Sequence, residues 1–179
     1  MDKNEFDAVF DKIVMESLVG LGFRKSGKSI YSLNEEANVS LIRLGGQNAW
    51  PGGISHVLCF RHTFLPNLDM KVPDSFESQA FSYPIKIDPD NIDTFLNKKD
   101  KYQPQNLRYE KGRYDYQDKP DYQIFSELNR LKNDIISFWE WSKSISPIYL
   151  KNEILSNGEA AWIEKLWLQA YESKLVIKH

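Results

Sequence analysis

The chain has 179 residues, a formal net charge of −2 and a hydrophobic content of 41%. This apolar content suffices to bury a core, which excludes a disordered chain, and the length fits one domain better than two. The near-neutral charge gives no sign of a general polyanion binder. The sequence therefore predicts a single globular domain over residues 1–179.

The composition also favours a particular compartment. The only cysteine, Cys59, cannot form an internal disulfide, which is typical of reducing surroundings. The first residues are acidic and amphipathic, unlike the basic and then apolar start of a signal peptide. No segment approaches the roughly 18 apolar residues of a membrane span. We therefore expect a cytoplasmic protein that does not enter a membrane.

The first half of the chain predicts a helix followed by strands. Residues 3–20 carry apolar side chains at spacings of three and four, which favours an amphipathic helix. Asp2 and Glu5 resemble a capping box at its start, and Gly20 and Gly22 suit its end. Strands are expected over residues 28–33, 39–44, 54–64 and 82–87, followed by a short helix over 90–96. Short connections between the first three strands favour antiparallel pairing.

The second half predicts helices after a polar segment. Residues 98–122 are dense in charged residues and tyrosines, and we interpret them as a surface excursion with a hairpin near Gly112. Helices are expected over 121–144, from Pro147 to about 155, and after Ser156. Strands and helices that are segregated in this way predict an α+β fold. Its parts are an N-terminal helix, an antiparallel sheet of about four strands, and a helical C-terminal third packed on the sheet.

The third predicted strand carries the most distinctive chemistry. Alternation places His56 and His62 on one face among apolar residues, and Cys59 and Arg61 on the other. The two histidines lie about 20 Å apart along an extended strand, too far to share a metal without other ligands. We expect no metal site and no cofactor, and Cys59 is typical of a small core residue. If a small-molecule site exists, it should lie at this strand, with Gln47, Trp50, His56, Arg61 and His62 as its binding residues.

The tyrosines of residues 98–122 indicate a second kind of site. Seven basic side chains in this segment are nearly balanced by five acidic ones, which argues against nucleic acid. A mixed, tyrosine-rich surface fits protein recognition, with Tyr109, Tyr114 and Tyr116 as candidate contacts. Trp139 and Trp141 also favour protein recognition, because two residues of one helix at this spacing cannot both face one core.

The N-terminal block is similar to a known family. The helix with Phe6 and Leu18, then Gly22-Phe23-Arg24-Lys25-Ser26-Gly27, Tyr31 and a later Gln47, resembles the bacterial family catalogued as domain of unknown function 4304. The resemblance covers about the first 65 residues. It implies a bacterial origin and an α+β fold, and it carries over no catalytic residue.

These observations favour binding over catalysis. No catalytic residues are assigned, and the leading hypothesis is a non-enzymatic protein-binding module of immunity- or antitoxin-like type. The alternatives are an enzyme or sensor for a small molecule at the third strand, and a weak nucleic-acid binder. The expected partner is another protein, and the oligomeric state is left open.

Overall fold

The computed structural model describes residues 1–33, 37–45, 50–63, 85–97, 112–156, 168–169 and 172–173. Six strands and a set of helices occur in these ranges. In chain order they are α1 (Lys3–Phe10), a π-helical stretch (Asp11–Met15), α2 (Glu16–Val19), β1 (Arg24–Ser26), β2 (Ser29–Leu33), β3 (Ala37–Leu44), β4 (Gly53–His62), β5 (Ile85–Ile87), a 3-10 turn (Pro89–Asn91) with α3 (Ile92–Asn97), β6 (Gly112–Asp115), α4 (Asp121–Ser142) and α5 (Pro147–Ser156).

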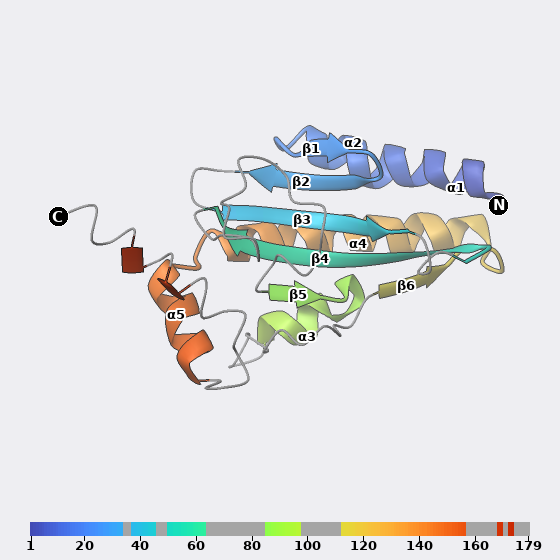
Figure 1. Cartoon of the computed structure of the whole chain (residues 1–179). Helices are drawn as coiled ribbons and strands as arrows, with labels where there is room; N and C mark the ends of the chain where they lie inside the picture. Colours follow the sequence, from blue (N-terminus) through green and yellow to red (C-terminus); the bar gives the residue numbers. More distant parts are fainter. Residues whose placement is uncertain are drawn as a thin grey trace.

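The strands form one antiparallel sheet in the order β1-β2-β3-β4-β5, and β6 also pairs with β4. β3 takes one edge of β4 along its length, while β5 and β6 share the other edge. Figure 1 shows these two short strands end to end beside β4. The α+β class, the N-terminal helix, the antiparallel sheet and the long helix packed on it are confirmed.

The first helix forms as its sequence predicts. The Asp2 carboxylate accepts hydrogen bonds from the backbone N–H groups of Asn4 and Glu5, and Glu5 accepts one from the Asp2 N–H, so the capping box is complete. The helix ends at Val19, and Gly22, with a φ of 99°, lies in the turn that follows. The apolar stripe of the helix, with Phe6 and Phe10 fully buried, lies against the sheet.

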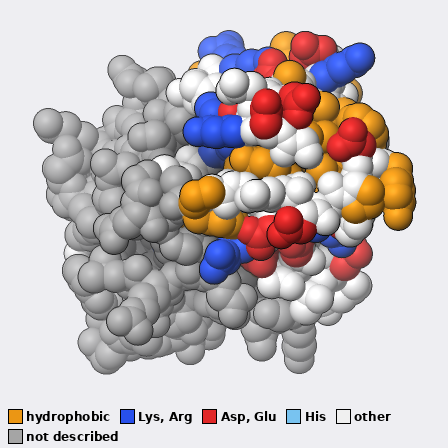
Figure 2. Space-filling view, turned by 90° about the vertical axis from the view of Figure 1, so that its right-hand side faces the viewer, with side chains coloured by type: hydrophobic (Ala, Val, Ile, Leu, Met, Phe, Trp, Pro, Cys, Tyr) orange, Lys and Arg blue, Asp and Glu red, His pale blue; other side chains and the backbone are white. Residues whose placement is uncertain are grey.

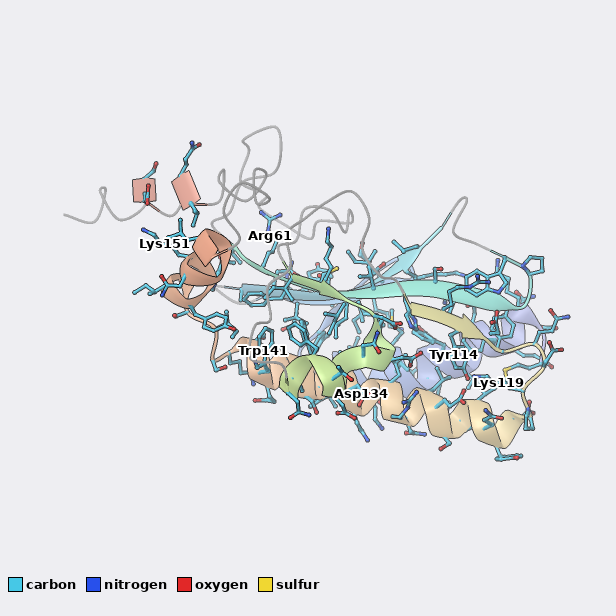
Figure 3. All side chains as sticks on the ribbon, turned by 90° about the horizontal axis from the view of Figure 1, so that it is seen from below. Arg61, Tyr114, Lys119, Asp134, Trp141 and Lys151 are labelled. Carbon is cyan, nitrogen blue, oxygen red and sulfur yellow. The ribbon has the colours of Figure 1, made fainter. Side chains whose placement is uncertain are left out.

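The helices cover one face of the sheet. α4 contacts both the N-terminal helical segment and β3, and Figure 3 shows α3 and α4 on the same side of the sheet. The core between these layers includes Leu58 and Phe60 of β4 and Ile135 and Phe138 of α4. The apolar face of each amphipathic element is thereby removed from water.

Trp139 and Trp141 are explained by two different packing partners around α4. Trp139 meets Phe23 edge to face, with the two ring centres 5.3 Å apart. Trp141 meets Phe95 of α3 in the same way at 5.0 Å. Both tryptophans are half-buried within the fold, so their spacing does not by itself require an interface with a partner.

The polar segment before α4 differs from its prediction. Residues 112–115 form β6 in the sheet, and its alternating burial puts Tyr114 in the core. The interpretation of residues 98–122 as a surface excursion is therefore wrong for this part, while residues 98–111 lie outside the described residues. The predicted helix after Ser156 falls largely outside them as well.

Candidate functional site

The polar residues of β4 do not converge on one site. His56 and His62 project from the helix-covered face, since they alternate with Leu58 and Phe60 of the core. Figure 3 shows Arg61 on the opposite side of the sheet from α4. The side chains of all three polar residues are buried. The interpretation of these residues as parts of one ligand site is therefore not supported.

His56 lies in a tight row across the sheet. It pairs in register with Arg43 of β3 and with Gly112 of β6. A Cβ on Gly112 would lie 2.5 Å from His56 Nε2 and 2.7 Å from Asp88 Oδ1, so the imidazole packs directly on the glycine backbone. Burial, and then the nearby charge of Arg43, lower the pKa of His56 to about 4. At neutral pH this imidazole is therefore uncharged, and at 2% exposure it is closed to ligands.

Cys59 belongs to a small apolar cluster. It is fully buried with Val57 and Ile42. Burial raises the pKa of the Cys59 thiol, which disfavours the thiolate that a nucleophile requires. This agrees with the prediction of a core residue.

The tyrosines predicted as partner contacts need a correction. Tyr114 and Tyr116 are 8% and 3% exposed, because Tyr114 of β6 and Tyr116 directly after it both pack on Phe6, whose ring centre lies 4.1 Å from that of Tyr116. The polar composition of the segment concealed this alternation. Tyr109, like Gln47 of the predicted strand site, lies outside the described residues.

An open cleft of about 900 Å³ lies at one end of the sheet. Its wall is assembled from the start of the chain, the end of β3, the turn before β4 and the exit of β6. The lining residues are Met1, Asp2, Lys3, Lys28, Arg43, Leu44, Gly45, Trp50, Pro51, Gly52, Gly53, Ile54, Ser55, Tyr116 and Gln117. Among the described residues of the two predicted sites, Trp50 and Tyr116 line this cleft. Figure 2 looks onto this end of the molecule, where basic and acidic side chains lie around hydrophobic ones.

Trp50 is held rigidly in the cleft wall. A Cβ on Gly53 would lie 2.2 Å from its indole, so the ring can lie on the turn only because that position is glycine. The indole Nε1 donates a hydrogen bond to Asp115, and the Arg113 guanidinium lies 4.4 Å from the ring centre. The carbonyl of Gly52, whose φ is +77°, accepts a hydrogen bond of 2.8 Å from the Tyr116 N–H. The turn is thereby fixed to β6.

The cleft carries a concentrated set of charges. Lys3, Lys28 and Arg43 line it, against Asp2 as the acidic residue of the lining. Asp7, on α1, forms ion pairs with both Lys28 and Arg43, the latter at 2.8 Å. Burial alone would raise the pKa of Asp7, but the hydrogen bonds from these two cations lower it below its usual value. Asp7 therefore stays ionised and holds the two cations at the cleft.

The described residues show no other candidate centre of a recognised type. In this part of the chain, no group of three or more His, Cys, Asp or Glu side chains is placed to hold a metal ion. None of the described helices is long and apolar enough to cross a membrane.

Comparison with known proteins gives no relative. No protein-family model, no curated protein and no solved structure matches this chain. The resemblance of its first 65 residues to a bacterial family of unknown function therefore stays a prediction.

Proposed function

We propose that the protein is a non-enzymatic binding module that holds a segment of another protein in the cleft at the end of its sheet. The observation that carries this proposal is the fixed position of Trp50, between the Gly53 backbone and Arg113. Tryptophan and arginine are the residues most enriched where protein interfaces gain their binding energy. A wall that is already rigid loses little conformational entropy when a partner docks.

The state of the candidate nucleophile and base supports binding rather than catalysis. Cys59 has a raised pKa and His56 a lowered one, and both side chains are closed to solvent. A general base needs access to the proton that it abstracts, and a thiol nucleophile needs its thiolate. An immunity- or antitoxin-like role for the module agrees with these features, and a toxin gene next to this one would strengthen it.

A small-molecule receptor is the second candidate function. The cleft volume of about 900 Å³ falls within the usual range for ligand pockets, and Pro51 and the accessible part of Trp50 give its wall an apolar portion. Both functions use the same cleft, so one pair of variants tests them together.

The test is affinity capture from the native cells with matched variants. We expect the wild-type protein to retain a stoichiometric protein partner that Trp50→Ala loses. Tyr122→Ala is the control, because Tyr122 is 76% exposed and does not line the cleft. Thermal melts of each variant check that the fold is kept. Capture of the partner by Trp50→Ala, or recovery of no stoichiometric partner, would contradict the proposal. A small molecule found by native mass spectrometry and lost in Trp50→Ala would favour the second candidate.

A further inference from the structure

We infer that the segment held in the cleft is acidic, with a carboxylate that meets Lys3 and Lys28 beside an apolar side chain that packs on Trp50. This inference rests on the proposed function and adds the chemistry of the partner. It follows from the charges of the cleft, from the ion pairs behind them and from the position of the indole.

The cleft offers cations that lack sufficient counter-charge. Lys3 is exposed and forms no ion pair with any described residue, while Lys28 is about half exposed and shares Asp7 with Arg43. The carboxylate of Asp2 caps α1 through uncharged backbone N–H groups, so it still counts in the balance, and with Asp7 it sets two negative charges against the three cations Lys3, Lys28 and Arg43. An incoming carboxylate therefore meets net positive charge at the rim, and complementary charge both attracts a partner and selects it.

The apolar surface lies beside these cations. Trp50 and Pro51 line the same cleft as Lys3 and Lys28, and the Arg113 guanidinium covers one face of the indole. A free phosphate or a single carboxylate would leave this surface wet. A peptide that combines acidic and apolar side chains would cover Pro51 and the accessible part of Trp50 and pair with the lysines at once, which is why we favour it over a simple anion.

Asp7 provides the most discriminating variant. It does not line the cleft, but its carboxylate neutralises both Lys28 and Arg43. An acidic ligand competes with Asp7 for these cations, so Asp7→Asn should tighten its binding. A residue with a merely structural role would weaken binding when replaced. Removal of Lys3 and Lys28 should act in the opposite direction.

The test is a titration followed by ¹⁵N NMR of the tryptophan side chains. The indole N–H signal of Trp50, assigned by its loss in Trp50→Phe, reports on the cleft wall. The probes are the blocked peptides Ac-Glu-Leu-Glu-Leu-Glu-NH₂, its Gln analogue and its Lys analogue, with an eight-residue oligothymidylate as the nucleic-acid probe. The variants are Lys3→Gln with Lys28→Gln, Asp7→Asn, and Lys12→Gln as the matched control, since Lys12 is an exposed lysine outside the cleft.

We expect the acidic peptide to move the Trp50 signal and to bind more tightly than its Gln analogue. The double lysine variant should weaken this binding about two- to fivefold per charge, the scale of exposed ion pairs, and Asp7→Asn should strengthen it by a similar factor. Lys12→Gln should leave it unchanged, and added salt should weaken it.

Equal or tighter binding of the Gln or Lys analogue, tighter binding of the oligothymidylate, or no shift with any peptide would overturn the inference. So would weaker binding by Asp7→Asn in a variant that melts at the wild-type temperature. If the cellular partner is still lost with Trp50→Ala while the acidic peptide fails, the binding module stands and only its proposed ligand chemistry is wrong.

Discussion

The acid stability of the protein should depend on His56. Its imidazole is buried between Arg43 and Gly112, and the Asp88 carboxylate lies close to the same glycine. Neither ring nitrogen has a hydrogen-bond partner among the described residues. Burial lowers the pKa of His56 from 6.5 to about 4. A proton that reaches this ring in the folded chain would be desolvated and would lie near the Arg43 guanidinium. The folded state therefore resists protonation that the unfolded state accepts.

The sign and size of the effect follow from these two pKa values. Below pH 6.5 the unfolded chain binds a proton on His56, and the folded chain does so only near pH 4, so the free energy of unfolding falls as the pH drops through this window. The full difference between the two pKa values corresponds to about 3 kcal/mol of unfolding free energy. About 2 kcal/mol of this is lost between pH 7 and pH 5. The stabilising carboxylates Asp7 and Glu127 have lowered pKa values, so their contributions are lost at still lower pH.

Urea unfolding at pH 5, 6 and 7 measures this loss for the wild-type protein and for His56→Gln. The glutamine side chain does not titrate, so the free energy of unfolding of the variant should fall by about 2 kcal/mol less than that of the wild type over this range. The difference between the two pH slopes isolates His56 from His62 and from the carboxylates. An identical slope in both proteins would refute the reasoning, because it would mean that the imidazole is as free to ionise in the folded chain as in the unfolded one.

Three further predictions concern stability and are checked by urea unfolding at pH 7. Gly53→Ala should cost about 1–3 kcal/mol and weaken capture of the partner, since the new Cβ would lie 2.2 Å from the indole of the cleft wall, whereas a Cβ on Gly45 would meet no described residue within 4 Å, and Gly45→Ala should change stability little. Phe138→Ala should cost about 3–5 kcal/mol, and Phe125→Ala on the same helix, 42% exposed, under about 1 kcal/mol; equal costs would contradict the packing of α4. Asp2→Ala should cost about 1 kcal/mol by removing the cap of α1, and an unchanged stability would count against that cap.

The larger elements could be predicted because their signals are local and long. The helical period runs through residues 3–20 and 121–144, and both segments are helical, apart from the final residues of each. The alternation in β4 likewise predicted a strand with different residues on its two faces. These patterns need no knowledge of distant neighbours, since burial of one face is enough to fix them.

Two short strands, β1 and β6, were missed because tertiary contacts decide them. β1 is the polar tripeptide Arg24–Ser26, which is a strand only because it pairs with β2. β6 has charged residues at every second position, and the composition of its surroundings hid this alternation. Gly112 and Tyr114 of β6 are buried, while Arg113 and Asp115 are exposed, so the period of two was present in the sequence.

The cleft shows why polar residues in a strand are a poor guide to a site in this fold. Both faces of β4 are buried, so His56, Arg61 and His62 are enclosed wherever they point. The cleft lies at the end of the sheet, where β3 ends and β4 begins. The turn with Trp50 at this place could be recognised from its residues alone. Arg43 connects the two places, because it pairs in register with His56 and also lines the cleft. Protonation of His56 would therefore add a positive charge next to Arg43, which is one of the cations of the cleft. Acid should thus change both the stability of the fold and the binding of the partner, because both depend on the surroundings of this arginine.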